Sequence, residues 1–182
     1  MLAIFKREFK SYFQNVIGWL FVAALLAVYG LYFYVYNLKN GYPYISYDLK
    51  GIGFIMMIAV PILTMRSLSD EKKTKTDQLM LTSPVSVGKI VAGKYFAMAA
   101  VYTIDIALFA LSPLVLSIYG KVALSEAYVA LFGYWLYGLS CIAVGLFISS
   151  ISESVIISAI LTFAALFLSL IHISEPTRPI SI

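Results

Sequence analysis

The chain has 182 residues, of which 62% are hydrophobic and 12% are charged, and its net charge at pH 7 is +4. Soluble domains are closer to half apolar and a quarter charged, so this composition excludes an ordinary soluble fold. It predicts instead an all-α, polytopic membrane protein, whose length suits about five spans of roughly 20 residues each. In such a protein the positive excess concerns topology, and we expect no nucleic-acid partner.

The first 13 residues predict an amphipathic helix that lies along the membrane surface. Lys6, Arg7 and Lys10 fall largely outside its apolar stripe. The apolar side chains recur at roughly helical spacing: Ile4, Phe5, Phe9, Tyr12 and Phe13. The alternative is a simple cytoplasmic start to the first span.

Five apolar runs follow this segment, and each predicts a membrane-spanning helix. The first covers residues 16–36, and a polar loop with Gly41 and Pro43 separates it from the second, 51–65. That second run is short for a bilayer, so we expect it to extend at both ends. The third covers 95–117, the fourth lies within 127–151, and the fifth begins at Val155.

The distribution of Lys and Arg predicts which side of the membrane each loop faces. The N-terminal segment and the loop 66–94 share one side and carry nine such residues, whereas the opposite side carries three. Basic residues favour the cytoplasmic side, so we expect the N-terminus and this loop to be cytoplasmic, in a multi-pass protein of the plasma membrane.

The loop 66–94 is the most polar stretch of the chain and has three parts. A charged run, 70–77, precedes a short apolar patch, 79–81, and Ser83-Pro84 then ends any helix before Ser86 caps the next one. This arrangement is typical of a docking surface for a cytoplasmic partner. The alternative is a solvated loop whose charges remain in water.

The same loop resembles that of ABC-2 type transporter permeases, especially the gliding-motility-associated and nitrous-oxide-reductase-maturation (copper-processing) permeases. The N-terminal KREFKSYFQNVIGWL is also similar to the opening of that family, so the resemblance covers nearly all of residues 1–167. Lys75 departs from the pattern, because the family often has Gly before the Thr. The matching positions of the loop are Pro61, Met65-Arg66, Glu71, Thr76, Leu79, Leu81, Pro84 and Lys94.

The resemblance implies a permease subunit that pairs with a second, identical or related permease, while cytoplasmic ABC ATPases dock below the pair. The chain has no G-x-x-x-x-G-K-[ST] motif, so we expect it to bind no cofactor itself and to be no enzyme, with ATP and Mg used by the ATPase subunit. The resemblance implies an exporter with an ATPase-coupling loop, whose contact residues would be Arg66, Asp70, Glu71, Thr76, Leu79, Leu81 and Pro84.

The C-terminal residues 168–178, LSLIHISEPTR, match the translation of a transposase-type sequencing adapter in all eleven codons. We therefore expect residues 168–182 to be adapter read-through and residues 1–167 to be an incomplete permease domain, since the family has six spans. His172, the one histidine, would then have no functional meaning. The alternative is a genuine polar C-terminus.

Asp105 lies near the middle of the third run, where a carboxylate costs about 2.5–3.5 kcal/mol on insertion scales. It would either line a substrate or ion pathway or form an interhelical hydrogen bond, and Tyr102, one turn earlier, is the expected partner. In the fourth run Gly138, Cys141 and Gly145 share one face and predict close helix packing rather than a reactive thiol.

Two other functions are weighed against transport. An intramembrane enzyme is disfavoured because the chain has no H-E-x-x-H motif and only one carboxylate expected at mid-membrane. A non-transporting membrane anchor that recruits a cytoplasmic ATPase stays open, since it would need the same loop and the same spans.

Overall fold

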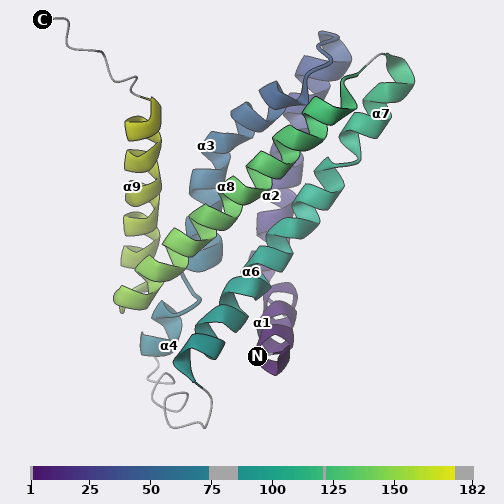
Figure 1. Ribbon diagram of the computed structural model, residues 1–182. Coiled ribbons are helices and arrows are strands. Elements are labelled where there is room, and N and C mark those ends of the chain that lie inside the picture. The colour runs from purple at the N-terminus through teal and green to yellow at the C-terminus, as the bar shows by residue number, and fades with distance from the viewer. Residues whose placement is uncertain (1, 74–85, 121, 175–182) are drawn as a thin grey trace, which may run out of the picture.

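The computed structural model describes residues 2–73, 86–120 and 122–174, of which 70, 73 and 172–174 are described by their backbone alone. Helices make up nearly all of these ranges (Figure 1). In chain order they are α1 (Leu2–Gln14), α2 (Val16–Tyr32), the π-helix η1 (Phe33–Lys39), α3 (Ile45–Thr64), α4 (Ser69–Lys73), α6 (Val87–Phe109), α7 (Ser112–Tyr119), α8 (Leu124–Ile151) and α9 (Val155–Ser174).

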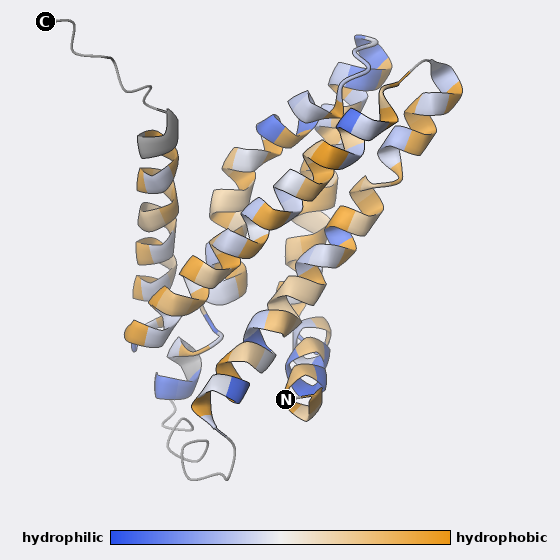
Figure 2. Ribbon diagram, in the orientation of Figure 1, coloured by the Kyte–Doolittle hydropathy of each residue, from blue (hydrophilic) through white to orange (hydrophobic). Residues whose placement is uncertain are grey.

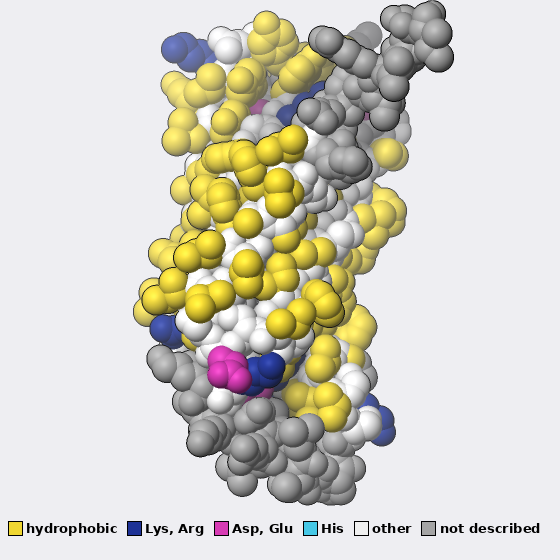
Figure 3. All heavy atoms as spheres, turned by 90° about the vertical axis from the view of Figure 1, so that its left-hand side faces the viewer, with side chains coloured by type: hydrophobic (Ala, Val, Ile, Leu, Met, Phe, Trp, Pro, Cys, Tyr) yellow, Lys and Arg dark blue, Asp and Glu magenta, His cyan; other side chains and the backbone are white. Residues whose placement is uncertain are grey.

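Four helical stretches are long and apolar enough to cross a membrane: Val16–Lys39, Ile45–Thr64, Val87–Tyr119 and Leu124–Ile151. A shorter apolar stretch, Val155–Ile171, follows them. The helices run side by side with apolar residues along their length (Figure 2), and on the face in Figure 3 the charged side chains gather towards the two ends. The prediction of an all-α, multi-pass membrane bundle is confirmed.

At three span boundaries the helix extends past a polar residue at which the span was expected to end. The first helical stretch continues through η1 to Lys39, and α3 begins at Ile45, so the expected polar loop shrinks to residues 40–44. The third helix begins at Val87 and therefore contains Lys94. Each difference has the same cause: a charged or amide side chain inside the helix is buried against protein and has a polar partner, so hydropathy alone misplaces the helix end.

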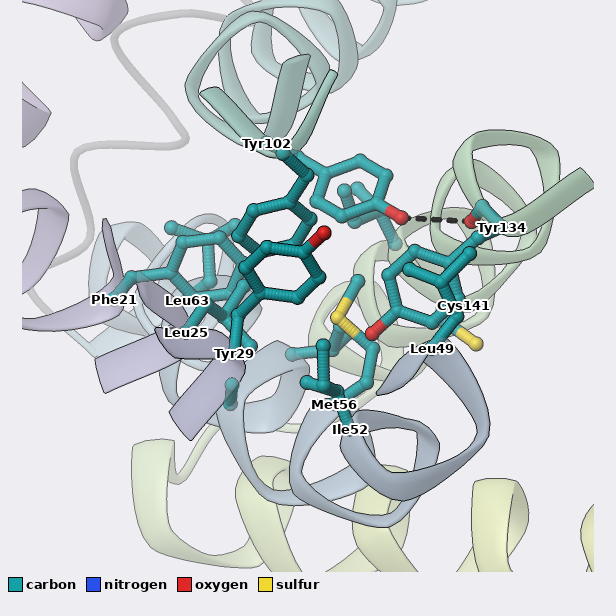
Figure 4. Close-up of a cluster of buried hydrophobic side chains, with 14 of the residues drawn as sticks. Phe21, Leu25, Tyr29, Leu49, Ile52, Met56, Leu63, Tyr102, Tyr134 and Cys141 are labelled. Carbon is teal, nitrogen blue, oxygen red and sulfur yellow. Dashed lines mark hydrogen bonds between the residues drawn. The ribbon is translucent and has the colours of Figure 1, made fainter. Parts of the chain in front are cut away.

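α3 lies at the centre of the bundle, where it packs against α2, α8, α9 and η1. Its buried side chains recur every three or four residues, as Leu49, Ile52 and Met56 illustrate, and the same spacing continues to Leu63. Figure 4 shows these side chains in one cluster with Tyr102 of α6 and Tyr134 of α8. The core of the protein is thus a seam of apolar and aromatic side chains around α3.

α1 packs against the start of α6 and against α2. Ile4 lies against the backbone of α6 at Gly93, where a Cβ atom would overlap it. Phe5, Phe9 and Phe13 form a row of neighbouring rings that ends at Trp19 of α2. The expected N-terminal helix is therefore present, and part of its apolar side contacts protein; its place at a membrane surface stays a prediction.

Candidate functional site

The segment that follows α3 is tied to the end of α8 by a single serine, Ser149. The backbone N–H groups of Leu68 and Ser69 both donate to Ser149 Oγ at 3.2 Å, and Ser69 Oγ donates to the Ser149 carbonyl oxygen at 3.1 Å. Ser149 and Ser69 are fully buried. Helix ends leave their first N–H groups and their last carbonyl oxygens unpaired. Here the N–H groups at the start of α4 bond to the Ser149 side chain, and the Ser149 carbonyl oxygen near the end of α8 accepts a hydrogen bond from Ser69.

Lys94 ties the same segment to α6. Its Nζ donates to Glu71 Oε1 of α4 at 2.6 Å and to the Ser67 carbonyl oxygen at 2.9 Å, and it lies 3.4 Å from Glu8 Oε1 of α1. The Lys94 side chain is 2% exposed, and the two glutamates are 16% and 19% exposed. An ammonium group has three N–H donors, so this set of acceptors uses all of them and compensates the cost of burying the charge.

Tyr12 of α1 adds a second contact near this ion-pair cluster. Its hydroxyl lies 3.5 Å from the Leu63 carbonyl oxygen at the end of α3. Burial, together with the charge of Glu8, raises the pKa of the Tyr12 hydroxyl above its usual value, so the group remains a donor. The segment after α3 therefore contacts α8 through Ser149 and α6 through Lys94, and α1 reaches Lys94 through Glu8 and the end of α3 through Tyr12.

The residues expected to form the ATPase-coupling loop lie in or next to this segment. Arg66 is exposed, Asp70 belongs to α4, and Glu71 is bound to Lys94. The other four, Thr76, Leu79, Leu81 and Pro84, lie outside the described residues. The contacts described above therefore involve only the first part of the loop, which is hydrogen-bonded to α8 and α6.

Replacing Ser149 with alanine is expected to release this segment, because the N–H groups of Leu68 and Ser69 would lose their shared acceptor. A buried donor left without a partner costs about 1–3 kcal/mol. Amide hydrogen exchange should therefore accelerate at residues 67–71 while the helices stay protected. Ser150→Ala is the matched control, since Ser150 Oγ bonds only within its own helix, to the Phe147 carbonyl oxygen; equal exchange in both variants would contradict the expectation.

Asp105 and Tyr102 do not pair with each other, so that expectation is wrong. Tyr102 donates its hydroxyl to the Tyr134 carbonyl oxygen of α8 at 2.7 Å (Figure 4). Asp105 is fully buried, and neither of its carboxylate oxygens has a hydrogen-bond partner among the described residues. The reason is geometric: the space beside α8 lets the long Tyr102 side chain reach across to a backbone oxygen.

Replacing Asp105 with alanine is expected to raise the free energy of unfolding by about 1 kcal/mol, since it removes a buried group without partners and leaves only a small cavity. Asp48 is the matched comparison. It is equally buried but accepts a hydrogen bond from the side-chain amide of Asn37, so Asp48→Ala should be destabilising. Both variants can be compared by denaturant titration in detergent micelles; the same sign for both would contradict this account.

Gly138, Cys141 and Gly145 lie on the buried face of α8. A Cβ atom at Gly138 would overlap the Tyr102 ring, and one at Gly145 would overlap Thr64 of α3. Cys141 is a buried, free thiol between these two contacts. The absence of side chains at the two glycines lets α6 and α3 approach α8 closely.

The sequence analysis missed two parts of this arrangement. Asp48 is a second buried carboxylate within a candidate span, and it escaped notice because it stands two residues before Lys50 in a stretch that resembles a loop. Ser149 stands in a Ser-Ser pair at the end of an apolar run, which carries no distinctive signal. Lys94 was named as part of the loop pattern, and its burial could have been expected, because a lysine that continues into an apolar helix predicts a buried partner.

The described residues contain no group of three or more His, Cys, Asp or Glu side chains that could hold a metal ion. The polar contacts described above instead join helix ends to the segment after α3. A family model described as "ABC-2 family transporter protein" matches residues 32–181. No curated protein and no solved structure matches the chain. The chain therefore belongs to the ABC-2 family of transporter proteins, as a multi-pass membrane permease component of an ABC transporter.

Proposed function

We propose that this chain is an exporter subunit in which a separate cytoplasmic ATPase docks on the loop 66–94 and moves the spans through that loop. The observation that carries the proposal is the set of contacts made by Ser149 and Lys94. They join the start of the loop to α8 and α6 at the same end of the bundle. A force that reaches residues 67–71 would therefore be passed to both helices through these contacts.

Charge supports the orientation that this proposal needs. The N-terminal segment and the loop together carry nine of the twelve Lys and Arg residues found before the C-terminal segment. We infer that this end faces the cytoplasm, across the plasma membrane, because basic residues favour that side. ATP and Mg would be bound by the ATPase subunit, and a second permease, identical or related, would complete the transporter. The loop pattern also supports a place near the gliding-motility-associated and nitrous-oxide-reductase-maturation permeases.

Affinity purification of the tagged chain from its own membranes tests the partnership. We expect an ATPase with a phosphate-binding loop to co-purify, and its hydrolysis rate in vesicles to depend on the permease. Glu71→Gln should reduce that dependence severalfold while the ATPase still binds, because the Lys94 contact weakens. Glu126→Gln, in the first turn of α8, is the control.

The outcomes separate the alternatives. If no such ATPase co-purifies, the proposal is wrong. If it co-purifies but its rate is the same with the parent chain and with the Glu71→Gln variant, the chain is better described as a membrane anchor that recruits an ATPase.

A further inference from the structure

We propose that a groove between α6 and α8 binds one acyl chain of an anionic phospholipid, whose headgroup is held by Lys6 and Lys10 of α1. The inference goes beyond the transport role and does not depend on it. The end of the bundle where α1 lies was proposed above to face the cytoplasm, so the lipid would come from the cytoplasmic leaflet; only this last step rests on the proposed orientation.

The groove has a volume of about 530 Å³, and its walls are almost entirely apolar. Ala99, Ala100 and Ala107 form much of its α6 wall, and Trp135 and Leu139 form its α8 wall. Tyr95, Phe96 and Ile104 also belong to the α6 wall, so the three alanines leave a hollow that is bounded by larger apolar side chains on both helices. Such a surface suits a flexible hydrocarbon chain.

The polar atoms that line the groove already have hydrogen-bond partners. Trp135 Nε1 donates to Thr103 Oγ1 at 3.1 Å, and Tyr95 donates its hydroxyl to the Leu139 carbonyl oxygen at 3.3 Å. Thr103 in turn donates to the Ala99 carbonyl oxygen at 2.7 Å. A polar solute would find no unpaired group among these three, whereas an acyl chain needs none.

The length of the groove also fits an acyl chain. Its α6 wall extends from Tyr95 to Ala107, a rise of roughly 18 Å at about 1.5 Å per residue. One leaflet of a bilayer contributes roughly 15 Å of a hydrocarbon core that is about 30 Å thick. The groove therefore covers the depth of one leaflet, starting from the end of the bundle where α1 lies (Figure 1).

The helix that reaches the groove, α1, also carries exposed positive charge. Phe5 of α1 lines the groove, and Lys6 and Lys10, one turn apart on the same helix, are exposed. Among the described residues neither lysine has a carboxylate partner, whereas Arg7 between them binds Glu8 at 2.7 Å. Basic residues at this position attract anionic headgroups. A second copy of the chain is the other candidate occupant, but it would give these lysines no role.

The chain offers its own reporter for this site. It has two tryptophans, so Trp19→Phe leaves Trp135, in the groove wall, as the only one. The full chain with this change is reconstituted in phosphatidylcholine vesicles that contain acyl-brominated phosphatidylglycerol or, in parallel, acyl-brominated phosphatidylcholine. We expect the brominated phosphatidylglycerol to quench Trp135 with an apparent affinity about fivefold higher.

Two sets of variants separate charge from shape. Lys6→Gln with Lys10→Gln should bring the affinity ratio to one, whereas Lys39→Gln with Lys50→Gln, at the opposite end, should leave it unchanged. Ala100→Leu should reduce quenching by both lipids, since it fills the groove, and Ala24→Leu on the exposed side of α2 is its control.

Three results would overturn the proposal. The first is an affinity ratio of one in the parent chain, and the second is quenching that Ala100→Leu leaves unchanged. The third is efficient disulfide dimerisation of an Ala100→Cys variant together with loss of quenching as the protein-to-lipid ratio rises, because a second copy would then occupy the groove.

Discussion

Replacing Lys94 with methionine is expected to lower the free energy of unfolding by about 3 kcal/mol. The substitution keeps most of the apolar stem but removes the ammonium group that binds Glu71, Glu8 and the Ser67 carbonyl oxygen. Losing one member of a buried ion pair typically costs about 3–5 kcal/mol. We expect the lower end of that range because both glutamates keep some contact with solvent.

The control for this prediction is Lys89→Met on the same helix. Lys89 is exposed, so its replacement should change stability by less than about 0.5 kcal/mol. Denaturant titration in detergent micelles measures both variants. The double variant Lys94→Met, Glu71→Gln should recover part of the loss, because Glu71→Gln removes one of the two negative charges that Lys94 balances in the parent chain. A loss of similar size at both lysines would show that the contacts of Lys94 with the two glutamates are not its cause.

The pattern of apolar runs in the sequence was sufficient to predict the helices. Each of the five expected spans falls in helix, because the bilayer requires about 20 apolar residues and the backbone cannot leave its hydrogen bonds unpaired. The third, 95–117, is divided between α6 and α7, a break that the apolar run did not predict. The helix boundaries were less predictable wherever a polar residue is buried. Asn37 and Asp48 looked like loop residues, yet their side chains hydrogen-bond each other inside the bundle, and the helices extend to include them.

The candidate site was only partly predictable, for a different reason. Family resemblance pointed to Glu71 and Lys94 as members of one sequence pattern, but sequence separation gives no sign that the two form an ion pair. The role of Ser149 depends on α8 ending beside α4, which is a property of tertiary packing. The Tyr102–Asp105 pair failed because spacing along one helix cannot show that a backbone oxygen on another helix is nearer.

Replacing Gly138 with alanine is the second substitution with a large expected effect. The added methyl group would overlap the Tyr102 ring, so the ring must move and its hydrogen bond to the Tyr134 carbonyl oxygen would break. Overpacking of a well-packed core costs about 1–3 kcal/mol, and the lost hydrogen bond adds about 1 kcal/mol. We therefore expect the free energy of unfolding to fall by roughly 2–4 kcal/mol.

Gly133 provides the matched control on the same helix, because a Cβ atom at Gly133 would meet nothing within 4 Å. Gly133→Ala should be neutral or stabilising by up to about 1 kcal/mol, since alanine favours the helix more than glycine does. Tyr102→Ala should remove most of the difference between the two glycine variants, because the overlapping ring is then absent. If Gly138→Ala and Gly133→Ala behaved alike in denaturant titration, α6 and α8 would not approach each other through Tyr102 and Gly138. The packing that brings Lys94 of α6 and Ser149 of α8 to the same segment would then need another support.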